Sequence, residues 1–183
     1  HVPAADQMVQ HVMTPDREPA ARFSNALSRE TNKKQMENVR EALTSVETRL
    51  RDMDKMGMDV QAISPSPFHF MYWLEPELAA RMSRAVNEHL AGIVAKHPDR
   101  FVALAHVPLQ SPDAAAAELE YCVKRLGFRG CEIGTNVVGG EVSRGRDQFW
   151  KMAQSLDVVV FMHPTGFTQG DRLTDHYFTN VIG

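Results

Sequence analysis

Between residues 36 and 53, hydrophobic side chains recur at intervals of three and four positions, with charged and polar residues between them. The recurring residues are Met36, Val39, Leu43, Val46, Leu50 and Met53. This spacing places them on one face of an amphipathic helix. The helix is expected to end at Gly57, since glycine commonly closes a helix in the left-handed conformation.

Residues 1–35 lack such a pattern. They contain Pro3, Pro15 and Pro19 and no sustained periodicity. We therefore expect a long first loop or insertion, with room for one short helix. Loops of this length are uncommon in compact domains unless they serve a function.

After Gly57, short apolar runs alternate with helical periodicity. The apolar runs predict strands at 59–64, 101–107, 130–134 and 157–162. Helices are expected from Pro76 to the His97-Pro98 turn, burying Leu78, Met82, Val86, His89 and Ile93, from 111 to 126 with Ser111 as N-cap, and from 147 to 156. The run 101–107 is apolar at nearly every position, as in a parallel strand covered on both faces.

This alternation predicts βαβ units and a parallel sheet, and so a single α/β domain over residues 1–183. Four strands are visible, whereas a closed (β/α)8 or TIM barrel needs eight. An open α/β sheet and an incomplete barrel both fit the periodicity. In both folds the functional residues lie at the carboxyl ends of the strands.

Composition narrows the class of protein. The chain has 183 residues, 43% of them hydrophobic and 23% charged, and a formal net charge of -3, as in a soluble globular domain. No basic block points to nucleic acid, and no apolar run approaches the roughly 18 residues that span a membrane. The first residues lack the basic and apolar regions of a signal peptide. Cys122 and Cys131 are expected to be buried thiols of a reducing compartment, which favours a cytoplasmic protein.

Three histidines lie at or just beyond expected strand ends. His163 follows the last apolar run and precedes Pro164. It is either a metal ligand or a hydrogen-bonded structural histidine. His106, inside or near the end of its strand, is expected to be buried and bonded to backbone. His69 lies in an aromatic loop with Phe68, Phe70, Tyr72 and Trp73 that can wall a ligand pocket or pack over the rim of the sheet.

The sequence gives only weak indications of other catalytic residues or ligand-binding motifs. Glu132, in the strand 130–134, is a candidate acid or base without an evident partner. The sequence has no dinucleotide-binding glycine fingerprint, no phosphate-binding P-loop and no Gly-x-Ser-x-Gly nucleophile elbow.

Four blocks of sequence, in order and with fitting spacing, resemble the second amidohydrolase family, in the branch that includes aminocarboxymuconate-semialdehyde decarboxylase. The first block runs from Arg49 to Pro67 and includes Asp-Met-Asp-Lys-Met-Gly. The second, His-Pro-Asp-Arg-Phe-Val-Ala-Leu-Ala-His-Val-Pro-Leu-Gln, covers 97–110. The third is 126–135, and the fourth is Val-Phe-Met-His-Pro at 160–164. The resemblance extends over about residues 36–183.

The resemblance implies a metal-dependent (β/α)8 barrel of which this chain holds about strands two to five. In that family one divalent metal, usually zinc, is bound by a His-x-His pair after strand one, a histidine after strand five and an aspartate after strand eight. His163 matches the strand-five histidine, and His1 is a candidate for the last histidine of the pair. The strand-eight aspartate ligand and the main catalytic acid or base are expected beyond Gly183, and without that ligand the chain alone is not expected to bind zinc tightly.

The resemblance also implies substrate-binding residues. Glu37 occupies the position of an arginine that grips the substrate carboxylate, and Arg40 lies one helical turn away. Phe70, Tyr72 and Trp73 match the aromatic pocket wall, and Tyr177 falls on an aromatic position.

Three functions follow as hypotheses. The first is a zinc-dependent carbon–carbon lyase that decarboxylates an unsaturated or aromatic carboxylic acid. The second is a hydrolase of an ester, lactone or amide in the same fold, with metal-bound hydroxide as nucleophile. The third is an inactive fragment or oligomer partner. A small-molecule carboxylate or lactone substrate and a homo-oligomeric state are expected for the first two.

Overall fold

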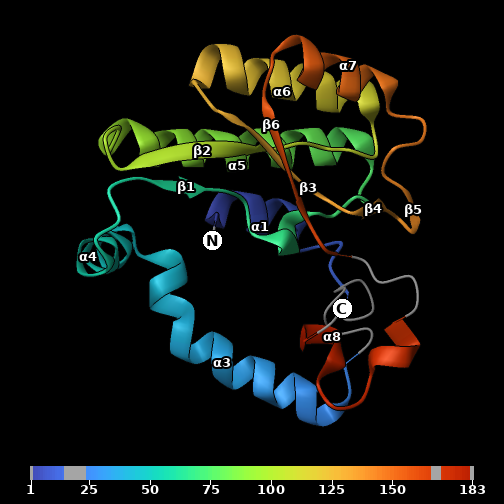
Figure 1. Cartoon of the computed structure of the whole chain (residues 1–183). Helices are drawn as coiled ribbons and strands as arrows, with labels where there is room; N and C mark the ends of the chain where they lie inside the picture. The colour runs from blue at the N-terminus through green and yellow to red at the C-terminus, as the bar shows by residue number, and fades with distance from the viewer. Residues whose placement is uncertain (1, 15–23, 166–169, 182–183) are drawn as a thin grey trace.

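A computed structural model of the chain describes residues 2–14, 24–165 and 170–181 (Figure 1). The first part holds helices α1 (Pro3–Val9), α3 (Ala26–Thr44) and α4 (Val46–Met56). The central part holds β1 (Gln61–Ile63), η2 (Pro67–His69), α5 (Pro76–Lys96), β2 (Phe101–His106), α6 (Pro112–Leu126) and β3 (Gly130–Gly134). The last part holds β4 (Asn136–Val137), β5 (Gly140–Glu141), α7 (Asp147–Ser155), β6 (Val159–His163), η3 (Gly170–Leu173) and α8 (Phe178–Val181).

Four parallel strands form one sheet in the order β1-β2-β3-β6, and β4 and β5 form a small antiparallel hairpin. A helix joins each successive pair of parallel strands, and α6 packs between α5 and α7 in a single layer. A sequential strand order with helices on one face is the arrangement of a (β/α)8 barrel, because a doubly wound sheet reverses its order at a switch point. The open α/β sheet is therefore ruled out in favour of part of a barrel.

The core lies between the sheet and its helices. Alternate residues of β2, namely Phe101, Ala103 and Ala105, are buried, and they meet a helical layer that includes Met82, Val86, Leu119 and Phe149. All five residues of β3 are buried, because neighbouring strands cover both of its edges. This rigid centre fixes the carboxyl ends of the strands relative to one another.

The expected helix at 36–57 is two helices. Ser45 has an extended backbone, which ends α3 before α4 begins. Its side chain accepts a hydrogen bond from the Thr48 N–H at 3.1 Å and so caps α4. The periodicity predicted one continuous helix because a serine can cap a new helix without changing the spacing of the apolar residues around it. As a result Met36 and Val39 are exposed on α3, whereas Met53 of α4 is buried.

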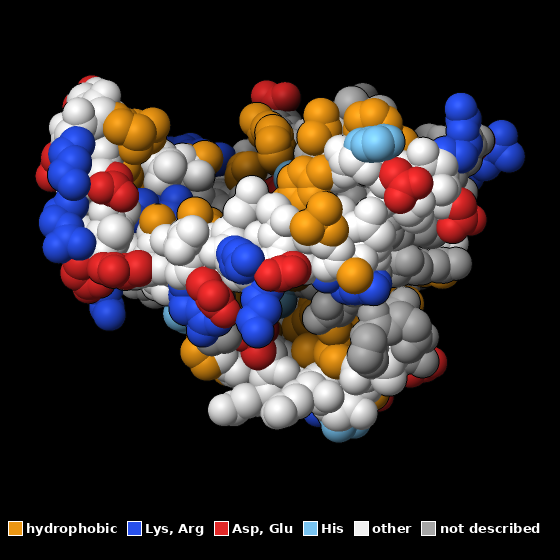
Figure 2. Space-filling model, turned by 90° about the horizontal axis from the view of Figure 1, so that it is seen from below, with side chains coloured by type: hydrophobic (Ala, Val, Ile, Leu, Met, Phe, Trp, Pro, Cys, Tyr) orange, Lys and Arg blue, Asp and Glu red, His pale blue; other side chains and the backbone are white. Residues whose placement is uncertain are grey.

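The first 35 residues are more helical than expected. The short helix α1 fits the single helix anticipated there, but α3 already begins at Ala26, where Asn25 accepts a hydrogen bond from the Ser28 N–H. Residues 15–23 lie outside the described residues. Helix α3 packs on α4 and extends away from the sheet (Figure 1). On the face of the molecule seen from below in Figure 2, acidic and basic side chains are interspersed with separate hydrophobic patches.

Smaller differences concern element ends and faces. Strands β1 and β6 cover 61–63 and 159–163, where 59–64 and 157–162 were expected. On α5, Met82 and Val86 are buried as expected, but His89 is exposed and its neighbour Leu90 is buried instead. Ser111 precedes α6 but makes no side-chain cap hydrogen bond.

Both cysteines are buried free thiols, as expected. No helix in the described ranges is long and apolar enough to cross a membrane.

Replacing Gly130 with alanine should loosen the contact between β3 and β6. A Cβ atom at Gly130 would lie 1.9 Å from the carbonyl oxygen of Val159. Such a contact forces two paired strands apart, and we expect the free energy of unfolding to fall by about 2–3 kcal/mol. Urea unfolding measures the loss. Gly92→Ala is the control, because a Cβ there meets nothing within 4 Å in the helix α5, and alanine should raise stability by up to about 1 kcal/mol. Equal stability of the two variants would contradict this reading of the sheet.

Candidate metal and substrate site

Polar side chains converge where the parallel strands end. His106 ends β2, Glu132 lies in β3, and His163 ends β6. The register pairs Glu132 with Phe161 and Gly134 with His163. Since side chains alternate between the faces of a strand, Glu132 and His163 belong to the same face. That face is opposite the helical layer, because Cys131, which precedes Glu132 on β3, interacts with Cys122 of α6.

His163 has the hydrogen bonding of a metal-ligand histidine. Its Nδ1 lies 2.9 Å from the carbonyl oxygen of Pro164, which can only accept a hydrogen bond. The proton therefore resides on Nδ1, and Nε2 keeps its lone pair. A backbone carbonyl that orients the imidazole in this way is typical of metal sites. The expected position of His163 at the carboxyl end of a parallel strand is confirmed, and its role as a ligand stays a prediction.

Glu132 is a buried carboxylate next to His163. Its residue is 3% exposed, and no hydrogen-bond partner reaches its Oε2 atom. Burial raises the pKa of the Glu132 carboxyl, and a hydrogen bond with Ser64 and the nearby His163 lower it in part. The sequence marked Glu132 only as an isolated acid. The neighbourhood of Ser64 and His163 depends on strand register, which the sequence does not reveal.

The aromatic loop after β1 reaches the same strand ends. The Tyr72 hydroxyl accepts a hydrogen bond from the Gly134 N–H at 3.0 Å, and the Phe70 ring stacks on Tyr72 with centroids 5.9 Å apart. Burial raises the pKa of Tyr72 well above its usual range. Phe70 and Tyr72 are buried, Trp73 is half-buried, and Phe68 is 54% exposed. The structure thus brings Tyr72 to the end of β3, and the role of these aromatics as a substrate wall stays a prediction.

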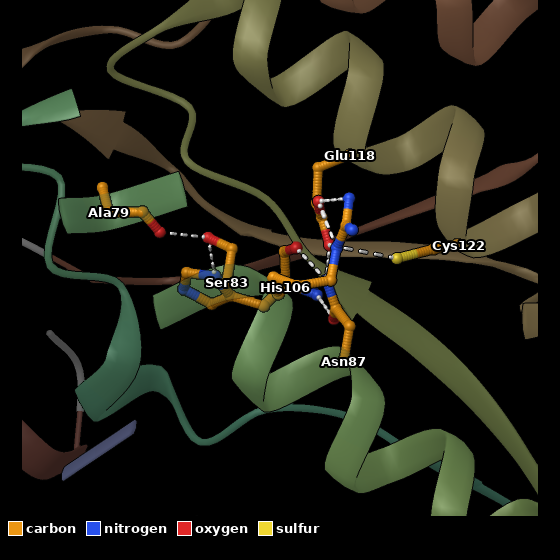
Figure 3. Close-up of polar contacts among 7 residues, drawn as sticks. Ala79, Ser83, Asn87, His106, Glu118 and Cys122 are labelled. Atoms are coloured by element: carbon orange, nitrogen blue, oxygen red, sulfur yellow. Dashed lines mark hydrogen bonds and ion pairs between the residues drawn. The ribbon is translucent and has the colours of Figure 1, made fainter. Parts of the chain in front are cut away.

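His106 is a structural histidine, as expected. Its Nε2 lies 2.8 Å from the carbonyl oxygen of His69, and its Nδ1 lies 2.8 Å from the Ser83 hydroxyl of α5 (Figure 3). Its backbone N–H and C=O are both bonded by the Asn87 side chain. The His69 carbonyl oxygen must accept from Nε2–H, and Nδ1 contacts the Ser83 hydroxyl, which itself donates to the Ala79 carbonyl oxygen at 2.8 Å. Both ring nitrogens are thereby used, and His106 has none left for a metal.

The pKa of His106 makes stability depend on pH. Burial lowers this pKa from 6.5 to about 4. Between those values the unfolded chain binds a proton that the folded chain does not, so the stabilising contribution is complete above pH 6.5 and is lost as the pH falls towards 4. The shift corresponds to about 3 kcal/mol. Urea unfolding between pH 4 and 7.5 should show this slope, and His106→Gln should flatten it. An unchanged slope in that variant would assign the effect to other groups.

The histidine of the aromatic loop, His69, is tied to the first helix. The Nε2 of His69 lies 3.1 Å from Oδ1 of Asp6 in α1, and its Nδ1 is buried without a hydrogen-bond partner. The side chain is 7% exposed. The contact holds α1 against the loop that follows β1, so the chain before residue 10 helps to shape the mouth of the sheet.

The remaining candidates lie farther from the strand ends or outside the described residues. Arg40 is exposed on α3, a helix that packs on α4, not on the sheet. The Tyr177 hydroxyl bonds Gln35 of α3 at 2.9 Å and also Asn32, and so joins the last described segment to α3. The structure does not bring Arg40 or Tyr177 to His163, and their substrate roles stay predictions. His1 lies outside the described residues.

The described residues include two candidate donors for a metal ion, His163 and Glu132. Within 2–14, 24–165 and 170–181 no group of three or more histidine, cysteine, aspartate or glutamate side chains is arranged to hold a metal ion. His163 and Glu132 offer an imidazole nitrogen and a carboxylate oxygen on one face of the sheet. Both donor types suit a divalent cation such as zinc or manganese.

A parallel sheet of sequential order, a single helical layer and a strand-end histidine define part of a (β/α)8 barrel with a candidate metal centre at its mouth. The chain belongs to the amidohydrolase family, whose sequence pattern it matches over residues 8–180. This establishes the family that the four sequence blocks indicated.

Several relatives of the chain are named as decarboxylases, and another is named as 2-keto-4-carboxy-3-hexenedioate hydratase. It is 28% identical over 138 residues to 2-amino-3-carboxymuconate-6-semialdehyde decarboxylase of Dictyostelium discoideum, a match that covers 75% of this chain and 38% of that protein. It is 34% identical over 142 residues to gamma-resorcylate decarboxylase of Rhizobium sp. (strain MTP-10005), covering 70% of this chain and 42% of that protein. The chain thus spans about two fifths of the length of these relatives.

A solved structure agrees with the fold. The dihydroxybenzoic acid decarboxylase from Polaromonas sp. JS666, with bound manganese and the inhibitor 2-nitroresorcinol, superposes with a TM-score of 0.63 at 28% identity. The match covers 87% of this chain and 48% of that chain. The partial sheet described above is therefore the arrangement of about half of such a barrel.

Proposed function

We propose that this chain forms the His163-bearing part of a metal-dependent decarboxylase that acts on an aromatic or unsaturated carboxylic acid. The observation that carries the proposal is the imidazole of His163, whose Nδ1 is held by the Pro164 carbonyl so that Nε2 is free at the mouth of the sheet. The decarboxylase names of the relatives support the lyase over the hydrolase and over an inactive partner.

The metal is proposed to be a divalent cation, manganese or zinc. Manganese in the Polaromonas structure supports the divalent ion, and the expected zinc rests on the family resemblance. The residues present fit such an ion, because His163 offers a free ring nitrogen and Glu132 a buried oxygen without a partner. When bound, the cation would act as a Lewis acid towards the substrate oxygens. Further ligands would come from other segments of the complete barrel, among them His1 if it reaches the mouth.

The chain's own residues would position the substrate. Phe70 and Tyr72 form a stacked aromatic floor beside the end of β3 and would exclude water from one side of a planar ring. Trp73 would extend this wall. Arg40 and Tyr177, on and against α3, would reach the substrate only if α3 closes over the mouth in the complete protein. A homo-oligomeric, cytoplasmic enzyme also stays a prediction.

The test is a product analysis of the complete protein loaded with manganese or zinc. Candidate substrates are 2,6-dihydroxybenzoate and 2-amino-3-carboxymuconate semialdehyde, with a panel of aryl esters and lactones for the hydrolase alternative. We expect release of one CO2 per substrate consumed and no acid production from the lactones. Acid release from esters or lactones without CO2 from the carboxylates would replace the lyase by a hydrolase.

A further inference from the structure

We propose that Glu132 is a metal ligand whose carboxylate contacts the same divalent cation as His163. The inference rests on the proposed function only in taking a divalent cation to be bound at the mouth of the sheet. It adds a donor from β3 to a site for which the family resemblance implied ligands only from strands one, five and eight.

The first support is the burial of Glu132. Glutamate is almost never buried unless it is paired or binds a metal, because an isolated carboxylate loses its hydration. Glu132 is 3% exposed, and no basic side chain forms an ion pair with it among the described residues. Ser64 satisfies one side of the carboxylate, whereas Oε2 has no partner. A cation at Oε2 would complete the coordination of this group.

The second support is the direction in which the side chains of Glu132 and His163 point. Glu132 and His163 lie two register positions apart on adjacent strands and point to the same face. The opposite face of β3 is filled, since Cys131 and Ile133 are fully buried there. The unpartnered oxygen and the free ring nitrogen therefore open into one region at the mouth of the sheet.

A second buried carboxylate among the described residues, Glu118, shows what a purely structural glutamate looks like. Glu118, 6% exposed on α6, accepts hydrogen bonds from the Arg84 Nε at 3.1 Å, from the Arg84 Nη2 at 2.8 Å and from the Asn87 Nδ2 at 2.8 Å. Its charge is compensated and both of its oxygens are used (Figure 3). Glu132 has no such arginine, so a structural role leaves its charge without compensation.

Metal binding by the complete protein tests the proposal without an activity assay. Manganese binding to the metal-free protein is measured by isothermal titration and by the loss of the free Mn²⁺ signal in electron paramagnetic resonance, for wild type, Glu132→Gln and Glu88→Gln. Glu132→Gln keeps the size and the hydrogen-bonding capacity of the side chain and removes its charge. We expect its Kd for manganese to rise at least about tenfold, the lower bound for groups that support a metal site. Glu88→Gln, on the exposed face of α5, should bind as wild type does.

The outcomes separate the possible roles. A Kd for Glu132→Gln within twofold of wild type overturns the proposal, and a loss of decarboxylation at that unchanged Kd would place Glu132 against the substrate. Wild-type protein that binds no manganese or zinc overturns it as well. Tight metal binding that depends on Glu132 in a protein that releases no CO2 supports the inference and rejects the proposed function. Thermal unfolding of the metal-free variants confirms that Glu132→Gln is folded.

Discussion

Replacing His163 with alanine is expected to weaken manganese binding by the complete protein more than about a hundredfold and to abolish CO2 release. Loss of a group that merely orients a metal ligand costs about 10–100-fold in metal affinity, and loss of the ligand itself should cost at least as much. The variant should fold, because His163 is only partly buried and ends a strand whose backbone pairing does not need the imidazole.

A matched control separates this effect from the loss of any histidine. His89 is exposed on α5, so His89→Ala should keep wild-type metal affinity and activity. Metal content by mass spectrometry after dialysis, followed by titration, measures both variants. If His163→Ala retains one tightly bound metal per chain, the strand-end histidine is structural and the metal lies elsewhere.

The second large effect concerns the polar network between α5, β2 and α6. Asn87→Ala should lower the free energy of unfolding by about 3–5 kcal/mol. The Asn87 side chain donates to the His106 carbonyl and to Glu118, each at 2.8 Å, and accepts from the His106 N–H at 2.7 Å (Figure 3). Each buried group left without a partner costs about 1–3 kcal/mol, and Asn87 serves three. Its residue is fully buried, so water cannot replace it.

The adjacent position supplies the control for this network. Glu88 is exposed on the same helix, and Glu88→Ala should change stability by less than about 0.5 kcal/mol. Urea unfolding of both variants at pH 7, analysed with a common slope, gives the difference. A loss below about 1 kcal/mol for Asn87→Ala would mean that the cavity admits water or relaxes, and the network would then be dispensable.

The layered fold could be predicted because its signals are local. Continuous apolar runs marked β2 and β6, the Pro76 and Pro112 positions marked helix starts, and glycine closed α6 at Gly127. The break at Ser45 could not be predicted, since the apolar spacing continues across it. The exposure of Met36 and Val39 depends on where α3 lies in space, which periodicity along one helix does not determine.

A site residue could be predicted from the sequence only where its immediate neighbours along the chain indicated its position. His163 had such a signal in the apolar run before it and the proline after it. Glu132 did not, because its significance comes from Ser64, just after β1, and from His163, about thirty positions along the chain. The substrate candidates Arg40 and Tyr177 came from the family resemblance alone, and their distance from the strand ends follows from the course of α3.

The two buried thiols offer a direct way to observe opening of this domain. Cys122 on α6 and Cys131 on β3 are fully buried on the two sides of the helix–sheet contact. Burial raises the pKa of Cys131 to about 12 and that of Cys122 further, so neither is a reactive thiolate in the native state. Alkylation must therefore wait until α6 separates from the sheet. The rate at which iodoacetamide modifies each cysteine then reports the local opening free energy of its element, without any engineered label.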